Sequence, residues 1–463
     1  MKKIILFIGA FFMTANIKAN EPKFPQMGKI DFTPPQVERW ETPNGLVVYS
    51  QSDRTLPIVH LTAMIKTGKV YDPREKIGLS ELFMTMLRDG GTTKYKAEEI
   101  DKKLEFLGAS IEPSINYEEA RLSLTCLKKD FDEVFDIFFD MLKEPAFEEK
   151  IFALKKEEAM EIIRRRNDKS DREAVREALR MFFGKDHPYG WRAEKETVSS
   201  ITIEDLRKYA RNYIKANNII IAAAGDMDND EFKKKIMDKF SSLDKGQVIF
   251  PEIGEVSLPQ SKKVYFIDKP VSQASVVILH EGVKRHDDRE YPLAVLSEYM
   301  GGGIQSKLGR EIRSNRGLAY SVYSYFSKRN KGGFIMTYLG TKPQSVYEGT
   351  SEILNQLNLA SQGNTENEGV DAAKSQIINS FVFRFPTVFN IVEERASYEY
   401  YGYKKDYLDN YVKKIDSVTE SEVKDAAKSF YKNDRALIFV IGDSKKFDKP
   451  VFELGQAQEL KED

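Results

Sequence analysis

The first group of residues that could support chemistry lies on a predicted helix over residues 79–88. Apolar residues recur there at i, i+3, i+4, i+7 and i+8, which is the pattern of an amphipathic helix. The opposite face carries Glu81, Met84 and Thr85. A carboxylate and a hydroxyl can supply oxygen ligands to a hard cation, but a thioether cannot accept a proton from water. We therefore find neither a zinc ligand set nor a base on this face, and interpret it as the wall of a cavity.

The second group begins with a glycine-rich loop, Gly301, Gly302 and Gly303, which suits a close approach of backbone or ligand. A predicted helix carrying Arg313 follows, and then a predicted strand that begins near residue 318 and carries Tyr320. A guanidinium and a phenol can both donate hydrogen bonds to negative charge that develops on a carbonyl oxygen. From residue types alone, however, the favoured interpretation is a surface charge and a packed strand residue.

Histidine and cysteine usage predicts no zinc site in this chain. The four histidines are His60, His187, His280 and His286. No two of them are four positions apart, which is the spacing of two histidine ligands on one helix. The single cysteine, Cys126, alternates with Leu122 and Leu124 on a predicted strand and is interpreted as a buried small hydrophobic residue. One cysteine also excludes an intrachain disulfide.

An internal repeat organises the elements that must position these residues. The segment from Ile201 and the segment from Val418 align without a gap at an offset of 217 residues. Thr202 matches Thr419, and Gly225-Asp226 matches Gly442-Asp443. Each copy predicts a threonine-capped helix, a short turn and an apolar strand. A period of this length indicates a duplicated domain rather than a solenoid.

Each half opens with strands and continues with helices, which predicts an α+β fold of two homologous domains. Each domain is expected to be a mixed, mostly antiparallel sheet covered by helices. A long, heavily charged helical region is predicted over roughly residues 149–183. The boundaries we predict are an N-terminal domain over 20–240, a linker over 241–262 and a C-terminal domain over 263–463.

Composition and the N-terminal residues limit the cellular setting. Lys+Arg is 71 and Asp+Glu is 72 in 463 residues, so no net charge favours nucleic acid. Residues 1–19 combine Lys2 and Lys3 with an apolar run and end at Ala19, which predicts a secretory signal peptide. A short uncleaved anchor is the alternative. We expect a periplasmic protein with no stable membrane insertion after cleavage.

The residue frame around the first helix resembles that of the pitrilysin/insulinase zinc peptidases, the inverzincins, whose helix carries H-x-x-E-H. Gly78-Leu79-Ser80 and Gly91-Thr92 match the frame at its two ends. The resemblance places Glu81 at the first histidine ligand, Met84 at the general base and Thr85 at the second histidine ligand. It covers nearly all of the mature chain and implies two lobes that form half of a clamshell chamber.

The resemblance also implies functions for residues on later elements. Glu161 stands where the family has its third zinc ligand, although a solvated helix carboxylate is an equally good interpretation. Catalytic zinc normally needs three protein ligands, so one remaining ligand is insufficient. Arg313 and Tyr320 fit the family frame R-x-x-x-G-L-A-Y, whose arginine and tyrosine contact the substrate backbone and the oxyanion.

These matches predict a non-catalytic subunit that grips peptide substrate and is inactive alone. A homologous partner with an intact H-x-x-E-H would supply zinc, since this chain is expected to hold no cofactor, and would form a heteromeric processing protease with it. A peptidase-like scaffold or peptide-binding protein without a hydrolytic partner is the second hypothesis. A stand-alone hydrolase with rearranged chemistry is the third and least favoured hypothesis, because no Ser/His or Cys/His arrangement stands out in the sequence.

Overall fold

The computed structural model describes residues 34–461, so the signal peptide predicted at residues 1–19 lies outside the described part of the chain. The first sheet comprises β1 (Glu38–Glu41), β2 (Val47–Ser52), β3 (Ile58–Ile65), β4 (Ser110–Ile115), β5 (Ala120–Leu127) and β6 (Ile219–Gly225). The second comprises β7 (Lys263–Asp268), β8 (Ala274–Glu281), β9 (Ser321–Lys328), β10 (Gly333–Thr341), β11 (Leu437–Gly442) and β12 (Ala457–Glu459).

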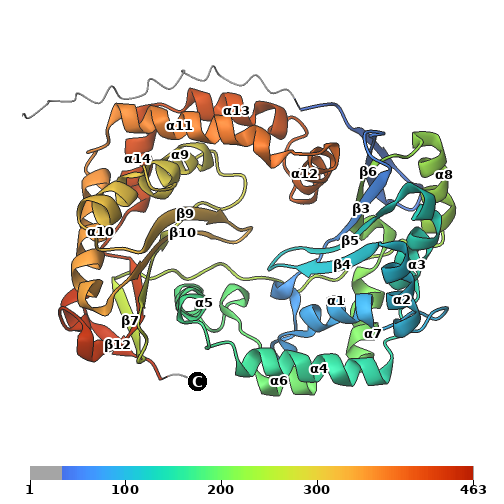
Figure 1. The fold of residues 1–463 in the computed structure, drawn as a ribbon, viewed down its shortest axis with the longest axis horizontal. Coiled ribbons are helices and arrows are strands. Elements are labelled where there is room, and N and C mark those ends of the chain that lie inside the picture. The colour runs from blue at the N-terminus through green and yellow to red at the C-terminus, as the bar shows by residue number, and fades with distance from the viewer. Residues whose placement is uncertain (1–33, 462–463) are drawn as a thin grey trace, which may run out of the picture.

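Five strands of each sheet share the same order and directions, which confirms the predicted α+β fold. The sixth strand differs, because β1 is antiparallel to β2 whereas β12 is parallel to β7. The strand orders of the two sheets are β1-β2-β6-β3-β5-β4 and β12-β7-β11-β8-β10-β9. In each sheet the central strand, β6 or β11, is parallel to one neighbour and antiparallel to the other. The two sheets occupy opposite sides of the molecule, and the hairpins β4–β5 and β9–β10 extend toward one another between them (Figure 1).

Helices cover both sheets. Those of the first half are α1 (Leu79–Asp89), α2 (Ala97–Leu107), α3 (Phe131–Lys143), α4 (Glu149–Arg164), α5 (Ser170–Phe183), α6 (Lys195–Ser200), α7 (Ile203–Tyr213) and α8 (Asn229–Phe240). Those of the second half are α9 (Glu290–Gly301), α10 (Val346–Ser361), α11 (Asn367–Phe381), α12 (Val388–Tyr400), α13 (Tyr407–Ser417) and α14 (Glu420–Phe430). No helix within residues 34–461 has the length and apolarity needed to cross a membrane.

The repeat detected in the sequence corresponds to equivalent structural units. Thr202 and Thr419 cap α7 and α14, and each accepts a hydrogen bond from the backbone N–H three residues on. In both cases an acidic side chain at that third position bonds back to the threonine N–H, which completes a capping box. The central strands β6 and β11 follow these helices, so the unit of helix, turn and strand recurs in each domain.

The two domains exchange one helix each. Helix α5 leaves the first half and packs on β8 and β11, where Ala178 and Phe182 join the apolar cluster of the second sheet. Helix α12 packs in return on β6 and β2, where Val392 and Ala396 cover the first sheet. Each sheet is therefore covered on one face by its own helices and on the other by a helix of its neighbour (Figure 1).

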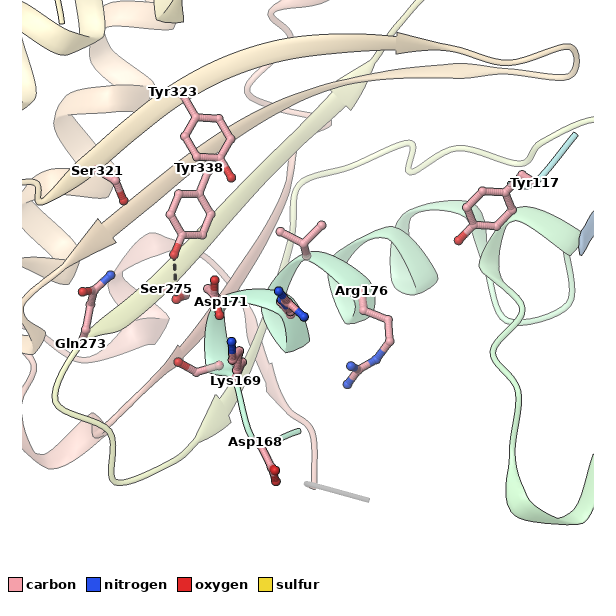
Figure 2. Close-up of a pocket in the computed structure, with 13 residues that line it drawn as sticks. Tyr117, Asp168, Lys169, Asp171, Arg176, Gln273, Ser275, Ser321, Tyr323 and Tyr338 are labelled. Carbon is pink, nitrogen blue, oxygen red and sulfur yellow. Dashed lines mark hydrogen bonds between the residues drawn. The ribbon is translucent and has the colours of Figure 1, made fainter. Parts of the chain in front are cut away.

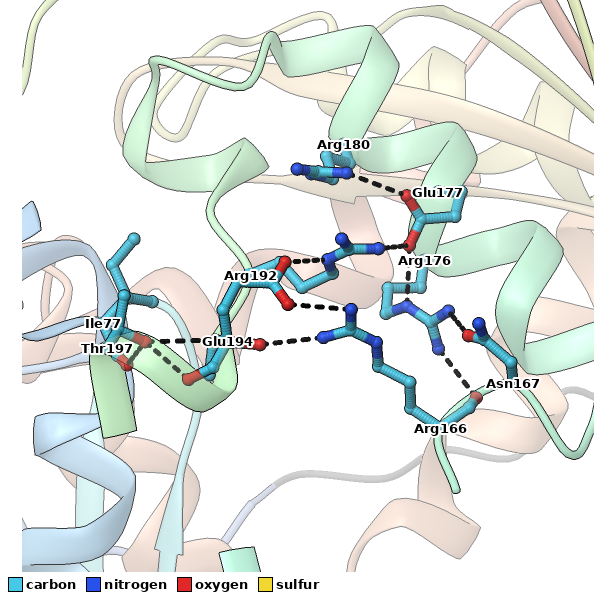
Figure 3. A network of polar contacts seen from close by, with 10 residues as sticks. Ile77, Arg166, Asn167, Arg176, Glu177, Arg180, Arg192, Glu194 and Thr197 are labelled. Carbon is cyan, nitrogen blue, oxygen red and sulfur yellow. Dashed lines mark hydrogen bonds and ion pairs between the residues drawn. The ribbon is translucent and has the colours of Figure 1, made fainter. Parts of the chain in front are cut away.

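The helical region that the sequence predicts over residues 149–183 consists of two helices in the structure. Helix α4 ends at Arg164 and α5 begins at Ser170, with turns between them. A polar network holds the crossing in place: Glu177 accepts hydrogen bonds from Arg176 (2.9 Å), Arg180 (3.3 Å) and Arg192 (2.8 Å) (Figure 3). Arg176 and Arg180 belong to α5 itself, so Arg192 is the residue that anchors α5 to the segment before α6.

Candidate functional site

The predicted metal-site face of α1 is built differently from an open cavity wall. Glu81 is half-exposed and forms an ion pair with Lys69 of the short helix η1 (Lys69–Tyr71). Thr85 donates its hydroxyl to the backbone oxygen of Glu81 (3.0 Å). Met84, in contrast, is 1% exposed and belongs to the hydrophobic core. The expectation that Met84 lines a cavity is therefore wrong, because its side chain points toward the core beneath the helix.

Glu161 lies on α4, which packs against α1. Its carboxylate accepts a hydrogen bond from Arg164 (2.7 Å) and is about half-exposed. The carboxylates of Glu81 and Glu161 are thus each paired with a cation of the chain itself. No group of three or more His, Cys, Asp and Glu side chains within residues 34–461 is arranged to hold a metal. This donor set does not fit catalytic zinc, which binds three nitrogen, sulfur or oxygen ligands.

A buried carboxylate, Asp72, positions the start of α1. Its two oxygens accept hydrogen bonds from the backbone N–H groups of Gly78 (2.8 Å) and Ser80 (2.9 Å), and the residue is 3% exposed. These bonds satisfy amides that the first turn of a helix leaves unpaired. Burial outweighs the two hydrogen bonds and raises the pKa of Asp72 from 3.8 to about 7. The folded chain therefore keeps a proton here that the unfolded chain loses.

We predict that Asp72 makes stability fall as pH rises between about 4 and 7, by up to about 1.4 kcal/mol per pH unit. In this window the folded state binds one more proton than the unfolded state, and above it both states are ionised. Asp72→Asn is neutral at every pH, so its free energy of unfolding should rise relative to wild type from pH 4 to pH 8. Urea titrations at several pH values measure this, and parallel curves would contradict it.

The glycine-rich loop is explained by packing as well as by conformation. A Cβ atom at Gly301 would collide with the amide nitrogen of Ser324 in β9, and one at Gly302 would collide with the side chain of Glu298. Gly303 has a φ of +135°, which disfavours residues with a side chain. The loop thus allows the end of α9 to lie directly on β9.

Arg313 and Tyr320 both precede β9 and are both accessible to solvent. Arg313 lies on the short π-helix η6 (Gly309–Asn315) and Tyr320 directly precedes β9. Both are exposed, Tyr320 by 62%, and neither side chain has a hydrogen-bond or ion-pair partner among the described residues. The two sets of donors are therefore available for another molecule.

A cavity of about 820 Å³ lies between the start of α5 and the inner face of the second sheet. Figure 2 shows Tyr323 and Tyr338 side by side above α5, with ring centroids 5.0 Å apart. The Tyr338 hydroxyl lies 3.0 Å from that of Ser275. Ser321 lines the cavity, but Arg313 and Tyr320 do not. Tyr323 of β9 and Tyr338 of β10 are direct cross-strand partners and so share one face of the sheet, but no sequence pattern shows that α5 forms the opposite wall.

Fold and site together define a two-domain, peptidase-like α+β protein whose described residues contain no catalytic metal centre. The domain described as "Insulinase (Peptidase family M16)" matches residues 47–193, and "Peptidase M16 inactive domain" matches residues 200–377. The chain belongs to the M16 insulinase family.

The relatives of this chain carry the names of both zinc proteases and a non-peptidase homolog. The chain is 24% identical to "Uncharacterized zinc protease YmxG" of Bacillus subtilis, over 87% of this chain and 98% of that protein. It is 26% identical to "Non-peptidase homolog YmxG" of Helicobacter pylori, over 87% and 93%. Crystal structures of a peptidase M16 inactive domain from Pseudomonas fluorescens (22% identity) and of a protease from Helicobacter pylori (18%) each superpose with a TM-score of 0.81. They cover 90% and 89% of this chain, and 99% and 100% of their own, and support the fold.

Proposed function

We propose that this chain is the non-catalytic, substrate-gripping subunit of a periplasmic heteromeric zinc metallopeptidase. A homologous subunit with an intact H-x-x-E-H supplies zinc, the attacking water and the base. This chain supplies Arg313 and Tyr320 as donors to the substrate backbone and to the oxyanion, and closes half of the chamber. Its substrates are peptides or unfolded protein segments.

One observation carries this proposal, namely the unequal state of the two candidate sites. Arg313 and Tyr320 are exposed and have no side-chain partner among the described residues. Glu81 is instead paired with a lysine and Glu161 with an arginine, and Met84 is buried. A guanidinium and a phenol left without partners can serve as donors to developing negative charge, provided that another molecule brings the reacting carbonyl.

Sheet edges suggest how an extended peptide is held. Asn116 donates to the backbone oxygen of Glu119 (2.8 Å) across the β4–β5 turn. Hydrogen-bonded pairs alternate along antiparallel strands, so Pro113 of β4 faces the free edge. Proline has no N–H, which removes a donor from the middle of that edge. Edge strand β9 has no proline and exposes Tyr323 and Tyr325, so we infer that β9 is the better strand for peptide addition.

The decisive experiment pairs the purified chain with a zinc-bearing homologous subunit. We expect the chain alone to cleave no peptide and to retain no stoichiometric zinc, and the pair to be active. In the pair, Tyr320→Phe should lower kcat by about 100-fold, which is the effect of removing one oxyanion donor. Peptide cleavage assays measure it, with zinc content determined in parallel.

Tyr347→Phe is the matched control, because Tyr347 lies on α10, away from β9 and its edge. It should leave kcat within about twofold, since the half-buried Tyr347 ring and its contact with Lys449 are retained when only the hydroxyl is removed. An unchanged rate for Tyr320→Phe in an active pair would remove the assigned function of this residue. Hydrolysis by the isolated chain that a chelator abolishes would overturn the proposal as a whole.

A peptidase-like scaffold without a hydrolytic partner is the second candidate. The Helicobacter pylori relative described as a non-peptidase homolog favours it. Co-purification distinguishes the two: a partner that carries H-x-x-E-H supports the subunit, and its absence supports the scaffold.

A further inference from the structure

The tips of two equivalent hairpins meet between the domains. The turn of β4–β5 carries Glu118, and the turn of β9–β10 carries Asn330. The Asn330 backbone N–H donates to the Glu118 carboxylate (2.8 Å). Figure 1 shows the two hairpins extending toward one another from opposite sheets. The contact therefore joins the two halves of the duplicated fold at corresponding points.

The Glu118 carboxylate gathers donors from three separate segments. Besides Asn330, its first oxygen accepts the hydroxyl of Tyr189, in the helix η4 (Pro188–Gly190). Its second oxygen accepts a hydrogen bond from Arg285 (3.1 Å), in the loop between β8 and α9. The Glu118 side chain is only 4% exposed. Removing the charge of Glu118 should be costly, because it would leave the Arg285 guanidinium buried without a compensating carboxylate.

A second arginine strengthens the charge balance at this point. Arg329, in the β9–β10 turn, is 7% exposed. Its guanidinium lies 4.0 Å from the ring centroid of Tyr117 and 4.7 Å from that of Tyr189. Its Nη1 atom has no hydrogen-bond partner among the described residues. The aromatic rings hold this cation by cation–π contact, and Glu118 is an acidic group whose charge acts on it.

The junction is partly hollow and combines polar groups with aromatic rings. A cavity of about 170 Å³ adjoins it, and its lining includes Lys66, Thr67, Glu118 and Asn330. A cavity of this size with polar walls can hold water. Separation of the two hairpin tips would break the Glu118 contacts and would also expose buried rings beside Arg329, among them Tyr189 and Phe334.

The segments beside the exchanged helices can accommodate such a movement. Residues 165–169 precede α5 and residues 401–406 follow α12, and neither segment forms regular helix or strand. Hinges are commonly a few residues at the ends of such elements. A change in the angle between the sheets, with α5 and α12 still packed, would bend these two segments and break the hydrogen bond from Lys269 of the second domain to the Asn167 backbone oxygen (2.8 Å).

We propose that Glu118 restrains the movement of the two domains about an interdomain hinge. By joining the tips of β4–β5 and β9–β10, it sets the angle between the sheets and so the position of Arg313 and Tyr320 relative to α1. This inference concerns the isolated chain and does not depend on the proposed function.

Spin labels on the two domains test whether Glu118 restrains the hinge. Cysteines replace Phe106 (89% exposed, on α2) and Phe452 (65% exposed, in the second domain), while the native Cys126 is 2% exposed. Pulsed electron resonance should give one narrow distance for this labelled parent. Glu118→Gln should broaden the distance or add a second one. An unchanged distance in Glu118→Gln overturns the proposal, even where the thermal midpoint falls.

Glu399→Gln is the matched control. Glu399 of α12 also binds an arginine and a tyrosine of the other domain, Arg39 (2.6 Å) and Tyr49 (2.5 Å). It lies within the exchanged-helix contact, so its loss should leave the interlabel distance unchanged, and an equal broadening would overturn the assignment to Glu118. Should Glu118→Gln fail to fold, Tyr189→Phe should speed amide exchange in both turns by about tenfold. Unchanged exchange in Tyr189→Phe would overturn the proposal.

Discussion

Residues 34–240 and residues 263–461, produced as separate fragments, are each expected to fail to fold. The first fragment lacks α12, so Ile220 and Ala222 of β6 lose their cover, and its α5 has no sheet to pack on. The second lacks α5, which exposes Val277 and Phe439. Apolar surface of this extent contributes about 25 cal/mol per Å² to folding and is not replaced by water. Circular dichroism and urea titration measure the outcome.

The control for this prediction is the intact chain, cleaved once in the linker after folding. Gly254 is exposed and lies in a segment without helix or strand, so a protease site introduced there is accessible. The cleaved halves should stay associated, because the exchanged helices hold them together without the linker. A cooperative unfolding transition in either fragment alone would show that the exchange is not required for folding.

Glu177→Ala is expected to lower the free energy of unfolding by about 3–5 kcal/mol, the cost of breaking a buried ion pair on one side. The Glu177 side chain is 7% exposed and is shared by three arginines, of which Arg192 is itself 10% exposed (Figure 3). Burial alone would raise the pKa of Glu177, but Arg192 and Arg176 outweigh it and lower the pKa below its usual value. The stabilisation is thus present above the unfolded pKa of about 4.5, and it is lost as the pH falls from there through the lower pKa of the folded state. Urea titrations at pH 7 and pH 4 measure both effects.

Glu204→Ala provides the comparison, because it breaks an exposed glutamate–arginine pair with Arg211 (2.7 Å). An exposed pair of this kind contributes about 0–1 kcal/mol. Equal losses from the two variants would contradict the argument that burial makes the Glu177 network important.

Several features were predictable from local sequence. The threonine caps at Thr202 and Thr419 and the strands that follow them recur at a fixed offset, which identifies the duplication without any tertiary information. The same holds for the amphipathic stripe of α1 and for the absence of a histidine pair. Such patterns are readable because capping, turns and hydrophobic periodicity depend on residues a few positions apart.

The continuous apolar runs of β6 and β11 also carry information about how these strands are covered. All seven residues of β6 and all six of β11 are buried, whereas a strand with one solvated face alternates. Both runs therefore indicate sheets that are covered on two faces. The sequence could not show which helix provides the second cover, because an apolar helix face fits either sheet.

What the sequence by itself determined is the α+β class, the duplication, and the loss of the residues that bind zinc and activate water. Only the tertiary structure decided that α5 and α12 exchange sheets, that Lys69 neutralises Glu81, that Met84 faces the core, and that Glu118 joins two hairpin tips. These contacts connect residues far apart in the chain. Their partners are selected by the packing of whole elements, which no local pattern encodes.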